Sequence, residues 1–143
     1  MSGLSQPVIL VVDDDIDVQA TMAHTFSGAR LSGVTASSTA TAMPVCQQQE
    51  RGIDALVTDL SLPGEAAGQL ARVLSAAYPS TKIVYASGIP RHIALSSGLV
   101  RSDAPYVEKP VDPRHAGQPP HKPASAVRTA ARQLVTGDWV ACG

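Results

Sequence analysis

Aromatic residues and cysteine are scarce in this chain of 143 residues, whose length is typical of a single domain. Aromatic side chains make up 3% of the sequence, against 44% for all apolar residues, so a core must be built mainly from Val, Leu, Ile and Ala. An aliphatic interior of this kind favours an α/β fold. The two cysteines, Cys46 and Cys142, belong to no paired motif, so neither a disulfide framework nor a zinc site is indicated.

An excess of charge of one sign and a long hydrophobic run are also missing. Lys and Arg total 11 and Asp and Glu total 12, which excludes the strongly basic surface typical of proteins that bind nucleic acid. The longest apolar run near the start, residues 8–12, is too short for a signal-peptide core or a membrane span and runs directly into acidic residues. We therefore expect a cytoplasmic protein with neither nucleic acid nor a membrane as a partner.

Apolar stretches alternate with helical patterns along most of the chain. Short aliphatic runs, typical of strands buried in a parallel sheet, lie at residues 7–12, 30–36, 53–58, 82–86 and 105–108. Helical patterns lie between them, at residues 16–28, 38–50, 66–77 and 91–97. Pro44 is expected to kink or delay the second of these helices because it lacks a backbone donor. The alternation predicts a doubly wound parallel sheet.

The pattern changes after residue 109. Residues 110–123 contain five prolines, which predicts an irregular loop. Residues 124–136 return to helical periodicity and are expected to form a last helix that docks on the sheet. The sequence thus predicts one domain over residues 1–143, with a core at 7–110, a Pro-rich loop at 110–123 and a C-terminal helix at about 124–136.

Polar side chains follow the predicted strands at the point where each strand ends. Asp13 and Asp14 follow the first strand, Asp59 the third, Ser87 the fourth and Lys109 the fifth. Because the carboxyl ends of parallel strands meet at one edge of the sheet, residues remote in sequence are expected to converge there. The next acids along the chain, at positions 15 and 17, are better interpreted as helix N-terminal acids than as ligands.

Carboxylates gathered in a pocket resist joint ionisation unless a positive charge lies between them. Hard oxygen ligands from Asp13, Asp14 and Asp59 suit Mg²⁺, which usually takes one or two protein carboxylates and a phosphate oxygen. Lys109 would add a fixed positive charge, and Ser87 with the backbone N–H of Gly88 would donate hydrogen bonds to a tetrahedral anion. These parts predict a phosphoryl-transfer site in which Asp59 is the carboxylate nucleophile.

The motifs that carry these residues are similar to those of the receiver domain of two-component response regulators, over residues 8 to about 113. They stand here as VVDDD (residues 11–15), TDLSLPG (58–64), YASG (85–88) and YVEKP (106–110). The resemblance implies a flavodoxin-like sheet with strand order 2-1-3-4-5. It further implies that Asp13 and Asp14 bind Mg²⁺, that Ser61 lends its backbone carbonyl to the metal, and that Asp59 takes a phosphoryl group from a histidine kinase or phosphotransfer protein.

The resemblance also implies roles for the residues near the fourth and fifth strands. Ser87 would be the switch hydroxyl, Lys109 the charge sensor and Tyr106 the rotating aromatic, although a half-buried strand aromatic is the alternative for Tyr106. The backbone of Ser61 and Gly88 would bind the phosphoryl group, and the Lys109–Pro110 peptide would be cis. The expected output is a change in contacts with a downstream protein target, with no turnover substrate.

The sequence departs from the family pattern at two places, and two other functions match part of the same residues. Ala67 stands where the family usually has glycine, and the Pro-rich insertion changes the start of the last helix. An aspartate-nucleophile phosphatase of the haloacid dehalogenase type would use Asp13 and Asp15, but position 17 is Asp rather than Thr or Val and few acids follow Lys109. A receiver-like interaction module without phosphorylation is the remaining alternative, and the complete set of pocket residues argues against it.

Overall fold

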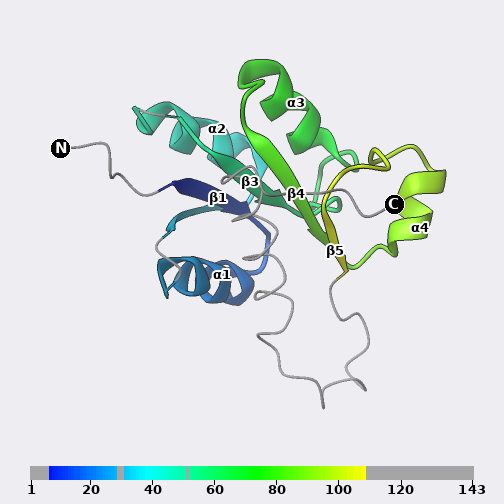
Figure 1. Ribbon diagram of the computed structural model, residues 1–143, viewed down its shortest axis with the longest axis horizontal. Helices are drawn as coiled ribbons and strands as arrows, with labels where there is room; N and C mark the ends of the chain where they lie inside the picture. Colours follow the sequence, from blue (N-terminus) through cyan, green and yellow to red (C-terminus); the bar gives the residue numbers. More distant parts are fainter. Residues whose placement is uncertain (1–6, 29–30, 51, 109–143) are drawn as a thin grey trace, which may run out of the picture.

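The computed structural model describes residues 7–28, 31–50 and 52–108 of the chain, as five strands alternating with four helices (Figure 1). In chain order they are β1 (Val8–Val12), α1 (Ile16–Gly28), β2 (Ser32–Ala36), α2 (Thr39–Gln48), β3 (Ala55–Thr58), α3 (Gln69–Ala77), β4 (Lys82–Ser87), α4 (Arg91–Ser96) and β5 (Tyr106–Glu108). The predicted loop at 110–123, the helix at 124–136, Lys109 and the Lys109–Pro110 peptide lie outside the described residues.

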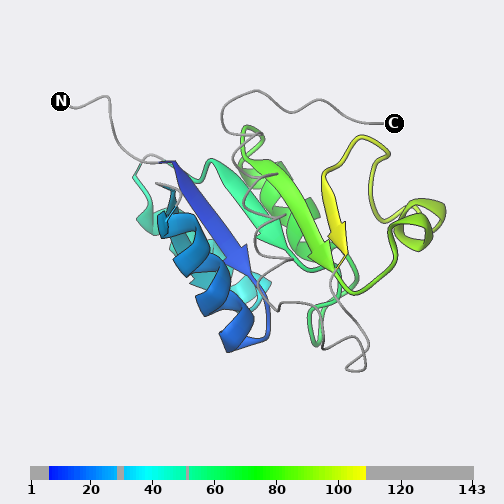
Figure 2. The ribbon, with the colours of Figure 1, turned by 60° about the horizontal axis from the view of Figure 1, so that its bottom comes forward.

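The five strands form one parallel sheet in the order β2-β1-β3-β4-β5. Helix α1 covers one face of the sheet, and α2 and α3 cover the other (Figures 1 and 2). The doubly wound sheet and the strand order 2-1-3-4-5 are therefore confirmed. None of the helices in the described ranges has both the length and the apolar character that crossing a membrane requires.

Alternate residues of the central strands build two separate hydrophobic clusters. Ile9 and Val11 of β1 pack with Phe26 of α1 on one face. Leu10 and Val12 lie in the cluster of the opposite face, which includes residues of α2 and α3. Because both faces of the sheet are covered, β1 is buried on both sides, and this explains why its sequence is a continuous apolar run rather than an alternating one.

Pro44 does not delay helix α2. The helix begins at Thr39, one residue after the predicted start, and runs through Pro44 to Gln48; Ser38 caps it in a reciprocal capping box with Thr41. Because Pro44 lacks an N–H, the carbonyl of Ala40 loses its partner within the helix. Both residues are exposed.

Helix α3 begins at Gln69 rather than near residue 66. Gly68, the residue before it, has a φ of 75°, in the left-handed region that glycine adopts without a steric penalty. The chain therefore turns at residues 66–68 and becomes helical only afterwards. Ala67 stands where the family usually has glycine, and the glycine of this turn is the next residue, Gly68.

Close packing of α1 on β2 predicts that Gly33 tolerates no side chain. A Cβ atom at Gly33 would lie 3.0 Å from the Cα of Ala23, a backbone atom that cannot rotate away. We expect Gly33→Ala to lower the free energy of unfolding by about 1–3 kcal/mol, as overpacking does elsewhere. Urea denaturation would measure it beside Ser32→Ala, a control on the same strand. Equal midpoints for the two variants would contradict this account of the packing.

Candidate functional site

Three carboxylates gather at the carboxyl edge of the sheet. One ligand atom from each of Asp13, Asp14 and Asp59 lies within 4.8 Å of those of the other two. Asp13 and Asp14 follow β1, and Asp59 follows β3, the strand paired with β1. Asp13 is buried, with 3% of its surface exposed, whereas Asp59 is half-buried and Asp14 is exposed. The predicted convergence of these three residues is confirmed.

Local hydrogen bonds hold Asp13 in place. Its Oδ1 accepts from the backbone N–H of Asp15 at 3.0 Å, and its own N–H donates to the carbonyl of Ala36, at the end of β2, at 3.2 Å. The side-chain amide of Gln19 donates to the carbonyl of Asp13 at 2.6 Å. The backbone of Asp13 is thus bonded both to the neighbouring strand and to α1, so the position of its carboxylate depends on both elements.

Asp15 caps α1 rather than joining the acidic cluster. Its Oδ1 accepts from the backbone N–H groups of Asp17 at 2.9 Å and Val18 at 3.3 Å, donors that have no partner inside the helix. Asp17 lies in the first turn of α1, where a negative charge favours the helix dipole. The interpretation of both acids as helix N-terminal residues is confirmed.

Asp59 lies at the start of the β3–α3 loop. Its Oδ1 accepts from the N–H of Ser61 at 3.0 Å, and its carbonyl accepts from the hydroxyl of Thr58 at 3.0 Å. Ser61 is exposed, while Leu60 and Leu62 on either side of it are buried. The two leucines anchor the loop, so Ser61 is held next to the Asp59 carboxylate; the predicted use of its carbonyl as a metal ligand stays a prediction.

The acidic cluster fits a divalent cation. Two oxygen atoms bound to one Mg²⁺ at about 2.1 Å lie at most about 4.2 Å apart, and the ligand atoms of the three carboxylates, all within 4.8 Å of one another, have a spacing of this order. All three ligands are hard oxygens, which Mg²⁺ prefers. A cation between them would relieve the repulsion of neighbouring negative charges. Asp13, Asp14 and Asp59 are therefore the residues that would hold the ion.

Ser87 and Tyr106 are linked through the backbone of Ile89. Ser87 is fully buried, and its Oγ accepts from the N–H of Ile89 at 3.2 Å. The Tyr106 hydroxyl donates to the carbonyl of Ile89 at 2.5 Å. Tyr106 is half-buried and its hydroxyl faces the β4–α4 loop, which includes Gly88. The role of Ile89 was missed by the sequence analysis, because a backbone carbonyl has no signature of its own.

Burial raises the pKa of Tyr106 above its ordinary value, a hydrogen bond from Ser87 lowers it in part, and the charges of Glu108 and Asp59 add to the rise. The phenol therefore stays protonated and remains a donor. Its ring also lies beside that of Tyr85 on β4, with centroids 6.2 Å apart and an angle of 33° between the planes. The contact with the Tyr85 ring and the hydrogen bond to Ile89 together hold Tyr106 beside the β4–α4 loop.

The raised pKa predicts how stability changes at high pH. Above about pH 10 the tyrosines of the unfolded chain ionise while Tyr106 in the native state keeps its proton, so the native state binds more protons and its stability falls as pH rises. Tyr106→Phe removes this contribution and should make the decline shallower. Denaturation series at several alkaline pH values would measure both slopes. Equal slopes for the variant and the wild type would contradict the assignment.

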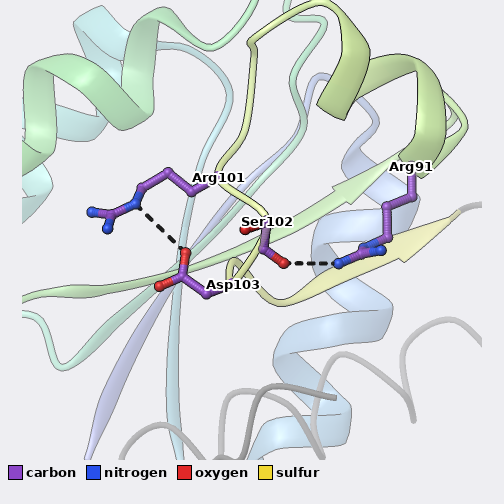
Figure 3. Close-up of polar contacts among 4 residues, drawn as sticks. All are labelled: Arg91, Arg101, Ser102 and Asp103. Carbon is purple, nitrogen blue, oxygen red and sulfur yellow. Dashed lines mark hydrogen bonds and ion pairs between the residues drawn. The ribbon is translucent and has the colours of Figure 1, made fainter. Parts of the chain in front are cut away.

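Two hydrogen bonds of Arg91 hold the start of α4. The Glu108 carboxylate accepts from the N–H of Arg91 at 2.7 Å, and the Arg91 guanidinium donates to the carbonyl of Ser102 at 3.0 Å (Figure 3). The first turn of α4 has no acid of its own, and Glu108 on β5 serves that purpose. The nearby ion pair of Arg101 and Asp103 is 3.5 Å long and highly exposed, so it contributes little.

Comparisons with known proteins agree with this geometry. The family model described as the response regulator receiver domain matches residues 9–117. A response regulator receiver protein from Sinorhizobium medicae is 26% identical with a TM-score of 0.71, and the match covers 95% of this chain and 99% of that one. The signal receiver domain of an HD domain-containing protein from Pseudomonas fluorescens is 19% identical with a TM-score of 0.71, and the match covers 96% and 93%.

The same fold is found in the chemotaxis response regulator CheY4 of Vibrio cholerae, which is 18% identical with a TM-score of 0.66; the match covers 89% of this chain and 98% of that one. A comparison with curated protein sequences gave no significant match. The family match spans well over half of the chain and includes the acidic cluster, Ser87 and Tyr106. The chain belongs to the response regulator receiver domain family.

Proposed function

We propose that this chain is a phosphoacceptor: Asp59 takes a phosphoryl group from a histidine kinase or a phosphotransfer protein, with Mg²⁺ held by Asp13, Asp14 and Asp59. The observation that carries the proposal is the meeting of these three carboxylates at the carboxyl edge of the sheet, in a chain of the receiver family. Because phosphohistidine is made from ATP, the proposal places the chain in the cytoplasm.

The proposed reaction is a displacement at phosphorus. An Asp59 carboxylate oxygen attacks the phosphorus of the phosphohistidine, the new O–P bond forms as the N–P bond breaks, and the imidazole nitrogen leaves with the bonding electron pair. Mg²⁺, when bound, would neutralise charge on the phosphoryl oxygens. The N–H of Ser61 and that of Asp15 hold the carboxylates of Asp59 and Asp13 in orientation. Water later cleaves the aspartyl phosphate. Because the acceptor is the chain's own side chain, the proposal includes no other turnover substrate.

The link through Ile89 supports a route from this site to the surface. The Ser87 hydroxyl accepts from the N–H of Ile89, and the carbonyl of Ile89 accepts from the Tyr106 hydroxyl. A phosphoryl group on Asp59 would be a stronger acceptor for that hydroxyl, with the Gly88 N–H and Lys109 as further partners. Drawing Ser87 away would break its bond to Ile89 and, by moving that residue, release Tyr106. The output in this proposal is a changed surface near β5, read by an unidentified protein target.

Two alternatives are weaker. A phosphatase of the haloacid dehalogenase type needs Asp15 as a second catalytic acid, but Asp15 caps α1, and the family match is to receivers. An interaction module without phosphorylation does not require three carboxylates within 4.8 Å of one another, an arrangement that repels itself without a cation. The receiver proposal uses every one of these carboxylates.

Incubation with acetyl phosphate tests the proposal directly. We expect intact-protein mass spectrometry to show one added phosphoryl group in the presence of Mg²⁺ and none when a chelator removes the ion. The modification should be labile, as an aspartyl phosphate is. Failure of the wild-type chain to gain a phosphoryl group under these conditions, with a known receiver as the positive control, would overturn the proposal.

A further inference from the structure

A second carboxylate of the β3–α3 loop, Glu65, is bonded to the start of α2. Its Oε2 accepts from the N–H of Thr39 at 2.8 Å, and its Oε1 accepts from the Thr39 hydroxyl at 2.5 Å. Both residues are half-buried. The Thr39 N–H has no partner within the helix, and a negative charge is favourable at this end of it, so the paired contact is stabilising.

The contact is not needed to cap α2. Ser38 already accepts from the N–H of Thr41 at 3.2 Å, and the Thr41 hydroxyl accepts from the N–H of Ser38 at 3.0 Å, which completes the helix's own capping box. Glu65 therefore adds a connection between two loops. What distinguishes the contact is the place in the fold where those two loops meet.

Thr39 and Glu65 follow strands that lie on either side of β1. Thr39 comes after β2 and Glu65 after β3, and the sheet order is β2-β1-β3. The contact therefore joins the loops that follow the two neighbours of β1, the strand that ends directly before Asp13. The N–H of Asp13 donates to the carbonyl of Ala36 on β2, and the N–H of Asp59 donates to the carbonyl of Val12 at 3.4 Å. The contact of Glu65 with Thr39 adds a link between the loops that follow these two strands.

The loop between Asp59 and Glu65 is short and is held by contacts of its own. Leu62 is buried in the α2 and α3 cluster, and its carbonyl accepts from the N–H of Glu65 at 3.1 Å. Pro63 between them has a fixed φ. Ser61, which donates to the Asp59 carboxylate, directly precedes this turn. Movement at Glu65 should therefore reach the ligand positions of the loop.

We propose that Glu65 is a positioning residue of the metal site: by bonding Thr39, it holds the β3–α3 loop, and with it Asp59 and Ser61, at the correct distance from Asp13. This role rests on the proposed function, because it concerns the same cation. Residues that hydrogen-bond a metal ligand directly commonly change metal affinity by about tenfold to a hundredfold when replaced, and Glu65, which acts on Asp59 through the loop, should lie at the lower end of this range.

Isothermal titration calorimetry with Mg²⁺ tests the role. We expect Glu65→Ala to weaken Mg²⁺ binding by about tenfold or more. Thr39→Val removes only the hydroxyl donor, so its loss should be smaller, and Thr39→Ser, which keeps a hydroxyl, should restore nearly wild-type affinity. The double variant Glu65→Ala, Thr39→Val should bind about as weakly as Glu65→Ala alone, because the two side chains act through one contact.

Asp54→Ala is the matched control. The Asp54 carboxylate accepts from the N–H of Val8 at 2.7 Å, which also joins two elements, but at the amino end of the strands. Its removal should lower stability without changing Mg²⁺ affinity. Amide NMR spectra without metal add a second readout: Glu65→Ala should shift the signals of Asp59 and Ser61, and Asp54→Ala should not.

The outcomes separate the two proposals. Wild-type Mg²⁺ affinity in a folded Glu65→Ala variant, or an equal loss in Asp54→Ala, would overturn the positioning role and leave the proposed function standing. Absence of Mg²⁺ binding in the wild-type chain itself would overturn the proposed function, and the positioning role with it. A selective loss in Glu65→Ala that Thr39→Ser does not share would support both.

Discussion

Asp59→Asn is expected to abolish phosphorylation by acetyl phosphate while leaving the fold intact. The amide oxygen can still accept from the N–H of Ser61, the 3.0 Å contact that orients the side chain, but an amide is a far weaker nucleophile than a carboxylate. Intact-protein mass spectrometry should show no added phosphoryl group at times when the wild-type chain is fully modified. Circular dichroism and the thermal midpoint should stay close to those of the wild type.

Asp54→Asn is the control for this result. This variant makes the same chemical change in a carboxylate that bonds Val8 at the amino ends of the strands, away from the acidic cluster. The variant should therefore still be phosphorylated at the wild-type rate. If Asp59→Asn incorporated the phosphoryl group as fast as the wild type does, Asp59 would not be the acceptor. Peptide mapping of the modified protein would then identify the residue that is.

Replacing Asp13 and Asp14 together by Ala is expected to remove measurable Mg²⁺ binding. The double variant keeps one of the three carboxylates of the cluster, and a single carboxylate binds Mg²⁺ only weakly. Mg²⁺ should raise the thermal midpoint of the wild-type chain by binding the native state, and it should leave that of the double variant unchanged. Phosphorylation by acetyl phosphate should be lost as well.

Asp17→Asn is the comparison for the double variant. Asp17 is an exposed acid in the first turn of α1, near the cluster in sequence but not one of its members. Its replacement should leave Mg²⁺ affinity within about twofold of the wild-type value, since an exposed charge outside the ligand set acts only through screened electrostatics. A double variant with undiminished Mg²⁺ affinity would show that the ion binds elsewhere.

The sequence by itself determined the strands and the place of the acidic residues at their ends. Continuous apolar runs such as 8–12 predict strands buried on both faces, and parallel strands bring their carboxyl ends to one edge, so Asp13 and Asp59 had to lie at the same edge of the sheet. Side-chain type and spacing are properties of the chain alone, and they were sufficient for this part. The pairing of β1 with β3, which brings the two carboxylates together, belongs to the tertiary structure.

Tertiary structure decided the contacts that depend on backbone groups and on loop paths. The Tyr106 hydroxyl donates to the carbonyl of Ile89, and Glu65 accepts from the N–H of Thr39. Every residue except proline offers the same carbonyl and N–H, so nothing in the residue types indicates which of them will be a partner. Their partners follow from strand order and loop closure, which place residues 17 and 26 positions apart within hydrogen-bonding distance.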